Sequence, residues 1–297
     1  MTTERHRFDI ARIGRAALAA LAPGRRGSVL AIFRRSFYVE CDGGALACIG
    51  PAGMGDGPLN GLARLPEGID WQASGLAVGA PAHVDGRALR IGNRFEFGLE
   101  SAAEWSPTRL PDGWSRDSLI SGLAELCRAA GRFDLSQGLA RLVMPDAPGD
   151  DALIVRGRAG AEALRKWIVG SEDRAEALSA DVSNLIGLGP GLTPSGDDLI
   201  GGAMIALYAL GRAETAVTLA DWALPIARVR TGKISLAHLA SAADGEGAGA
   251  LHEAIAAVAA NDADAIAAAI AALDAIGHSS GWDALAGAVA VMSALSA

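Results

Sequence analysis

The side chains best suited to chemistry in this chain are gathered in one loop rich in glycine and proline. Residues 187–198 read GLGPGLTPSGDD and lead into an apolar segment at 199–210. Glycine permits backbone conformations that bring the chain close to a ligand. The loop ends with two hydroxyl groups and two carboxylates, which can hold or transfer protons. The loop residues that we take as candidates are Gly189, Gly191, Thr193, Ser195, Asp197 and Asp198.

The apolar segment after the loop predicts a buried helix that starts there. The first turn of a helix has N–H groups without intrahelical partners, and the helix dipole makes that end positive. Both properties favour a small bound anion. An alternative is that Ser195 and Asp198 form only a capping box, the Ser-x-x-Asp pattern that starts many helices. That alternative leaves Gly187, Gly189 and Gly191, and the other aspartate, Asp197, unexplained.

Two nucleotide-binding loops share features with this one but fit its context less well. The glycine fingerprint for dinucleotides follows a strand, whereas residues 175–186 have helical composition. A Walker loop requires Gly-Lys-Ser or Gly-Lys-Thr, which is absent from residues 187–198. A small anion is therefore the expected guest.

A second segment repeats the pattern of the first. Residues 195–203 (SGDDLIGGA) resemble residues 280–288 (SGWDALAGA), 85 positions later. Each copy begins with Ser-x-x-Asp and has a glycine seven residues after its serine, at Gly202 and Gly287. Glycine at these places would let two helices approach closely. We predict a pseudo-symmetric helix pair whose N-termini converge on one pocket.

A histidine precedes the second copy, in the sequence GHSSGWD at 277–283. His278, with Ser279 and Ser280 beside it, is a candidate proton donor or oxyanion partner. A capping role at the helix start is the alternative. A Ser–His–Asp hydrolase is not indicated, because the Gly-x-Ser-x-Gly elbow is absent and adjacent residues in one turn cannot easily form a triad.

A third segment, RVRTGKIS at 228–235, carries hydroxyl and cationic side chains. Thr231 and Ser235 are four residues apart, so on one helix they would share a face. The cationic residues Arg228, Arg230 and Lys233 can donate to carboxylate or phosphate, or they are ordinary solvated surface charges.

A metal is only weakly indicated. Asp197, Asp198 and Asp283 would suit Mg²⁺ if the two helix starts met, but histidine-rich and thiolate patterns are lacking. We therefore expect no cofactor, with Mg²⁺ as the alternative.

Composition limits the classes of partner. The chain has 297 residues and a formal net charge of −8, which argues against nucleic acid, since nucleic acid usually selects a concentrated basic face. Its longest apolar run has 12 residues, whereas a bilayer requires about 20. Three cysteines in no metal-binding spacing and a polar N-terminus are typical of a cytoplasmic protein. We expect neither a membrane nor nucleic acid as a partner.

Hydrophobic patterns divide the chain into a β-rich domain at 1–112 and a helical domain at 113–297, an α+β class. Helical spacing covers 9–22, and short runs of β-formers at 28–100 predict an antiparallel sheet or small barrel, with a loop at 50–68. The second domain is predicted to hold helices at 117–130, 134–143, 152–169, 172–186, 198–210, 213–223, 231–242, 249–259, 262–274 and 283–296.

These segments together resemble the AllH-like family, named for a subunit of oxamate carbamoyltransferase. The resemblance is carried by GLGPGLTPSGDDLIGG (187–202), TGKIS (231–235) and GHSSGWDALAG (277–287), with GDGPLN (55–60) nearer the N-terminus. It implies carbamoyl transfer, in which oxalurate and phosphate are exchanged for oxamate and carbamoyl phosphate. It also implies partner subunits from two other families; a homo-oligomer is the alternative.

The resemblance and the residue chemistry together lead to one set of expected roles. Catalysis is expected of Asp197, Asp198 and His278, and anion-binding amides of the two helix starts. Substrate binding is expected of Gly189, Gly191, Thr193, Ser195, Thr231, Ser235, Ser279 and Ser280. Two other functions are alternatives: a stand-alone hydrolase of a small amide or ureido compound, and a non-catalytic anion-binding assembly subunit.

Overall fold

The computed structural model describes residues 5–144, 151–170 and 178–297. The chain divides into two compact units, Met1–Ser106 and Pro107–Ala297. Each has its own hydrophobic core, and each is described by itself.

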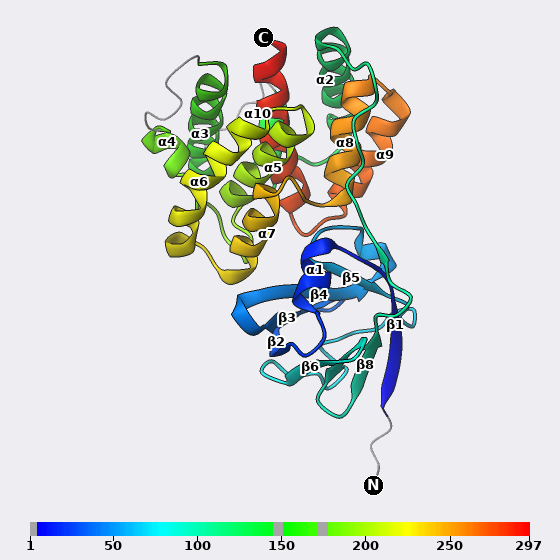
Figure 1. The fold of residues 1–297 in the computed structure, drawn as a ribbon. Coiled ribbons are helices and arrows are strands. Elements are labelled where there is room, and N and C mark those ends of the chain that lie inside the picture. Colours follow the sequence, from blue (N-terminus) through cyan, green and yellow to red (C-terminus); the bar gives the residue numbers. More distant parts are fainter. Residues whose placement is uncertain (1–4, 145–150, 171–177) are drawn as a thin grey trace. The chain divides into compact units, whose positions relative to one another are not determined.

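The first unit is a barrel. Eight strands follow one another in the order β5-β4-β3-β2-β6-β7-β8-β1, and β1 pairs again with β5, so the described sheet closes (Figure 1). A ninth strand, β9, adds to β1. The strands are β1 (His6–Ile13), β2 (Arg26–Ile32), β3 (Phe37–Cys41), β4 (Ala45–Pro51), β5 (Asn60–Ala63), β6 (Pro81–Asp85), β7 (Ala88–Ile91), β8 (Phe95–Gly98) and β9 (Ala103–Glu104).

The predicted small barrel is thus confirmed, but its sheet is mixed rather than antiparallel. β1 runs parallel to β8 and β9, and β4 runs parallel to β5. The helix predicted at 9–22 is wrong in its first half, where β1 forms, and only α1 (Arg15–Ala20) is helical. Ile10 and Ile13 are spaced as on a helix, yet both are buried in the barrel core. Strand pairing across the barrel overrides local spacing here.

The second unit is helical in its described residues, and the predicted helices at 117–130, 152–169 and beyond 198 are confirmed. The helix predicted at 134–143 is wrong, because only a 3₁₀ turn forms there, and the one at 172–186 falls partly outside the described residues. The elements are α2 (Arg116–Ala130), η3 (Ala140–Val143), α3 (Ala152–Val169), α4 (Ala180–Ser183), α5 (Ser195–Ala209), α6 (Ala213–Arg230), α7 (Lys233–Ala243), α8 (Gly249–Ala260), α9 (Ala263–Asp274) and α10 (Ser280–Ser296).

Helices α5 and α10 form the centre of this unit, with α3, α4 and α6 on one side and α2, α8 and α9 on the other (Figure 1). Both central helices are buried along almost their whole length. A Cβ atom on Gly202 would lie 1.9 Å from the carbonyl oxygen of Ala284, and one on Gly287 would lie 1.9 Å from that of Leu199. The predicted close approach at these two glycines is confirmed.

Candidate functional site

The N-terminal ends of α5 and α10 meet. Thr193, just before α5, and Ser280, the first residue of α10, place their hydroxyl oxygens 2.9 Å apart. Ser280 is also hydrogen-bonded to Asp198, and Ser195 is hydrogen-bonded to Asp283. Since Ser280 and Asp283 are the counterparts of Ser195 and Asp198, the first serine of each helix pairs with the aspartate of the other. The two helix starts meet as predicted, whereas the pocket predicted at their meeting point stays a prediction.

The pairing of each serine with the aspartate of the other helix corrects the alternative in which Ser195 and Asp198 form a capping box. The cap residues of the two helices are Pro194 and Ser279, and neither makes a side-chain capping bond. Ser195 and Ser280 are instead the first helical residues. The glycine contacts hold the two helix axes so close that each serine reaches the carboxylate of the neighbouring helix.

Asp197 ties the glycine loop to the segment at 231–235. Its side chain is buried, and its Oδ1 accepts the N–H of Gly187 at 2.8 Å. Its Oδ2 accepts the hydroxyl groups of Thr231 and Ser235, the latter at 2.7 Å. The two hydroxyls therefore converge, although they do not share a helix face: Thr231 is the residue that follows α6, and Ser235 lies in α7. Three donors to one buried carboxylate hold the loop in place.

Asp198 is held differently. Its Oδ2 atom is buried and has no hydrogen-bond partner among the described residues. Burial raises the pKa of this carboxyl well above its ordinary value, and the nearby charges of Asp283 and Asp197 raise it further. Hydrogen bonds from Ser280 and Thr193 oppose the shift without cancelling it. The folded protein therefore keeps the proton of Asp198 to a higher pH than an exposed aspartate would, and the protonated carboxyl can donate a hydrogen bond or a proton.

Asp283 anchors a segment that sequence reasoning missed. Its carboxylate is fully buried and accepts the N–H of Leu139 at 2.6 Å and the hydroxyl of Ser279 at 2.8 Å. Burial is the main cause that raises its pKa. Gly138 has a φ of +54°, and a Cβ there would lie 2.4 Å from Asp283 Oδ1. Nothing in the local sequence around Gly138 indicates this contact, which depends on α10.

The first amides of α5 are not free, contrary to expectation. Gly196 donates to the carbonyl of Leu188 at 2.9 Å, and Asp197 and Asp198 donate to that of Pro194 at 2.9 and 3.1 Å. The loop folds back over the helix start, so the protein itself uses these three donors. An anion at this place requires other donors.

Two further candidates lie apart from these contacts. His278 is exposed, and its Nε2 lies 2.9 Å from Oε1 of Gln137. Gly191 is also exposed, and a Cβ there would meet nothing within 4 Å. Gly189 lies closer in, since its Cβ would come within 3.2 Å of Ser195 Oγ.

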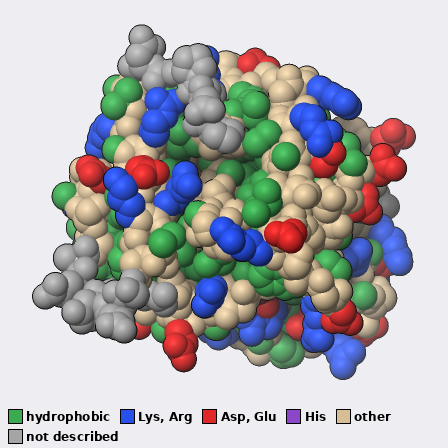
Figure 2. Space-filling model, turned by 90° about the horizontal axis from the view of Figure 1, so that it is seen from above, with side chains coloured by type: hydrophobic (Ala, Val, Ile, Leu, Met, Phe, Trp, Pro, Cys, Tyr) green, Lys and Arg blue, Asp and Glu red, His purple; other side chains and the backbone are tan. Residues whose placement is uncertain are grey.

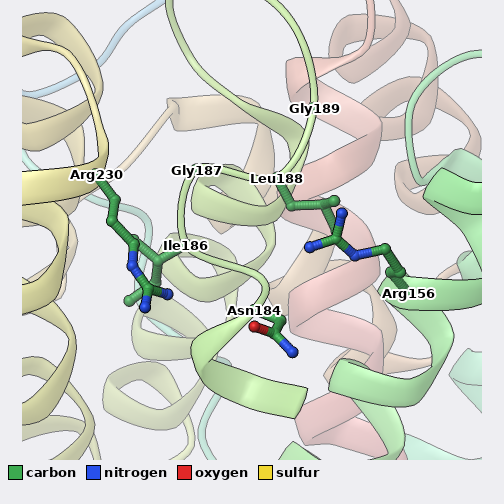
Figure 3. A pocket seen from close by; sticks show the side chains of 7 residues that line it. All are labelled: Arg156, Asn184, Ile186, Gly187, Leu188, Gly189 and Arg230. Carbon is green, nitrogen blue, oxygen red and sulfur yellow. The ribbon is translucent and has the colours of Figure 1, made fainter. Parts of the chain in front are cut away.

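A hollow of about 360 Å³ lies at the glycine loop itself (Figure 3). Its walls include Arg156 from α3 and Arg230 from the end of α6, on opposite sides of the loop. The remaining lining residues are Asn184, Ile186, Gly187, Leu188 and Gly189. Sequence reasoning singled out Arg230 but missed Arg156, which stands in no recognisable motif.

Among the residues that the structure describes, no three His, Cys, Asp or Glu side chains are grouped so that they could hold a metal ion. Within the same residues, no helix has the length and apolarity to cross a bilayer. On the face shown in Figure 2, Lys and Arg side chains are scattered among hydrophobic ones rather than gathered into one patch.

Comparison with known proteins matches two family models to the chain. Residues 185–292 match the model described as oxamate carbamoyltransferase subunit AllH. Residues 9–104 match the model described as the AllH family N-terminal domain. No curated protein and no solved structure matches. The first match includes the glycine loop, α5 and most of α10, and the second includes the strands β2 to β9. Because the two models together cover most of its length, the chain belongs to the AllH family.

Proposed function

We propose that this chain is a carbamoyltransferase subunit that acts on a small ureido acid such as oxalurate, with phosphate or carbamoyl phosphate as the other reactant. The family description supports the reaction class and, by the word subunit, the need for partner chains. The observation in the structure that carries the proposal is the Oδ2 atom of Asp198, which is buried without a hydrogen-bond partner among the described residues, at the meeting point of two helix starts where burial raises the pKa of the carboxyl.

In the proposed step, one proton goes to the leaving nitrogen and one comes from the attacking hydrogen phosphate. A phosphate oxygen attacks the carbamoyl carbon of oxalurate, and the bond from that carbon to the inner nitrogen breaks. The products are carbamoyl phosphate and oxamate, whose new NH₂ group needs one proton. A neutral Asp198 supplies it as a general acid and regains a proton from the attacking hydrogen phosphate.

The other cluster residues serve positioning in this proposal. Asp197 fixes the loop through Gly187, and Asp283 fixes the start of α10 through Ser279. Hydroxyl groups of Thr193 and Ser280 lie beside Asp198 and orient its carboxyl. The anionic end of the substrate binds at the glycine loop, beside the helix starts. We assign no step to His278, because it is exposed and faces Gln137.

The test is phosphate-dependent cleavage of oxalurate by the protein together with its partner subunits. Wild-type complexes should form carbamoyl phosphate and oxamate in equal amounts. Asp198→Asn cannot donate the proton and should lower kcat by about 10²–10⁴-fold. Asp181→Asn, which changes an exposed aspartate of α4, is the matched control and should keep the wild-type rate.

Other outcomes would favour the alternatives. Release of ammonia from oxalurate or related ureido acids without phosphate would indicate a hydrolase. Tight binding without turnover, in every combination of subunits, would indicate an anion-binding assembly subunit. A full rate in Asp198→Asn would remove Asp198 from the mechanism.

A further inference from the structure

Two arginines that are far apart in the sequence face the same small hollow. Arg156 projects from α3 and Arg230 from the end of α6, and the loop at 186–189 lies between them (Figure 3). Asn184 adds an amide, and Ile186 and Leu188 add apolar surface. A guanidinium group has a planar set of N–H donors that matches the oxygens of phosphate or carboxylate.

The positive charge in this hollow is not balanced by its walls. No acidic residue is among the described residues that line it. Arg230 donates through Nη1 to the carbonyl and hydroxyl oxygens of Ser183, at 2.8 and 3.2 Å, and both acceptors are neutral. The guanidinium is thus held in place while its charge stays available to a ligand.

The carboxyl group of Asp197, which contacts Gly187 of the lining, already accepts hydrogen bonds from the protein itself. Asp197 is buried, and its two oxygens accept the N–H of Gly187 and the hydroxyls of Thr231 and Ser235. Asp197 is not among the residues that line the hollow. The described walls therefore offer an anion two cations and an amide.

We propose that this hollow binds the oxyanion group of a small ligand, a phosphate or a carboxylate, between Arg156 and Arg230. Its volume of about 360 Å³ is near the lower end of small-molecule sites, which range from about 300 to 1,000 Å³. The site supplies the donors that the paired amides of α5 do not. The role of the anion in catalysis rests on the proposed function, whereas its binding does not.

The experiment measures binding by calorimetry on the isolated full-length protein, with no turnover required. Inorganic phosphate and oxamate are titrated separately, so that the two arms distinguish a phosphate site from a carboxylate site. The test variants are Arg156→Gln and Arg230→Gln. Their matched controls are Arg158→Gln and Arg228→Gln, which remove the same charge two residues away, on helix positions that do not line the hollow.

Each test variant should raise the Kd of the bound anion by about tenfold or more, because it loses a charge-assisted hydrogen bond. Each control should change it by less than about twofold. Arg230→Lys keeps the charge but not the planar fork, and it should bind with intermediate affinity if the variant is folded by circular dichroism.

The proposal is overturned if the wild-type protein binds neither anion at millimolar concentration. It is also overturned if the controls weaken binding as much as the test variants, since the effect would then come from net charge alone. Anion binding that depends on both arginines, in a protein whose complexes never cleave oxalurate, would retain this site and reject the proposed function. Oxalurate cleavage that is unaffected by Arg156→Gln and Arg230→Gln would retain the proposed function and reject a role of this hollow in it.

Discussion

Gly202 in α5 and Gly287 in α10 make reciprocal contacts: a Cβ atom on either one would lie 1.9 Å from a carbonyl oxygen of the other helix. The oxygens belong to Ala284 and Leu199, which are themselves equivalent in the two related segments. The helix pair is therefore pseudo-symmetric at its point of closest approach. The same relation continues to the helix starts, where Ser195 and Ser280 exchange aspartate partners.

The first prediction concerns this contact. Gly202→Ala or Gly287→Ala should lower the free energy of unfolding by about 1–3 kcal/mol or more, because the added methyl group overlaps backbone that cannot move easily. Gly201→Ala is a matched control on the same helix, since its Cβ would have its nearest neighbour at 3.6 Å. The control should be neutral or stabilising by up to about 1 kcal/mol. Urea unfolding followed by circular dichroism measures the difference, and equal effects in all three variants would contradict the close packing.

The second prediction concerns Asp197. Asp197→Asn should cost about 1–3 kcal/mol of stability, because the donors around it lose one of the two acceptor oxygens. If the carboxylate acts through Ser235, the effects of Asp197→Asn and Ser235→Ala should not add, and a double-mutant cycle should show a coupling of about 0.5 kcal/mol or more. Additive effects would mean that the hydrogen bond to Ser235 contributes little.

The third prediction is a pH dependence. The folded protein holds the proton of Asp198 to a higher pH than the unfolded chain does, because the folded pKa is raised. Stability relative to Asp198→Asn should therefore fall as pH rises from the unfolded pKa of about 3.9 to the raised folded pKa, and level off above it. The slope should not exceed about 1.4 kcal/mol per pH unit.

Urea unfolding of wild type and Asp198→Asn at a series of pH values from about 4 upward tests this dependence. The difference between the two proteins isolates Asp198 from the other titrating groups. A difference that stays constant, or one in which the wild type gains stability with rising pH, would contradict a neutral Asp198 in the folded protein.

The fourth prediction concerns Gly138. Gly138→Ala should destabilise the protein by about 1–3 kcal/mol from backbone strain at its positive φ alone. The methyl group would also lie 2.4 Å from Asp283 Oδ1 and 2.7 Å from Ser279 Oγ, so the start of α10 should shift. Gly131→Ala is the control, since it has a helical φ of −62° and its nearest contact would be 3.6 Å. Thermal unfolding and the oxalurate assay should both report a larger loss for Gly138→Ala.

Much of the helical unit could be predicted from the sequence. Helices such as α5 and α10 follow from long apolar and small-residue segments, and their close contact follows from glycines at matching positions. The glycine loop could likewise be recognised, because an ordinary connection between helices does not require so many glycines, hydroxyl groups and carboxylates in one place. These features depend on residues near one another in the chain, and local conformational preference and periodicity are enough to identify them.

The tertiary structure decided which residues contact one another. The sequence pattern allowed Ser195 to cap its own helix, but the close packing at Gly202 and Gly287 brings Asp283 within its reach. Arg156 and Gly138 reach the loop and α10 only through the folding of other elements. In the barrel, Ile10 and Ile13 have helical spacing, yet the strands on either side hold them in β1. In each case the deciding free energy comes from contacts between residues far apart in the chain, which no local pattern encodes.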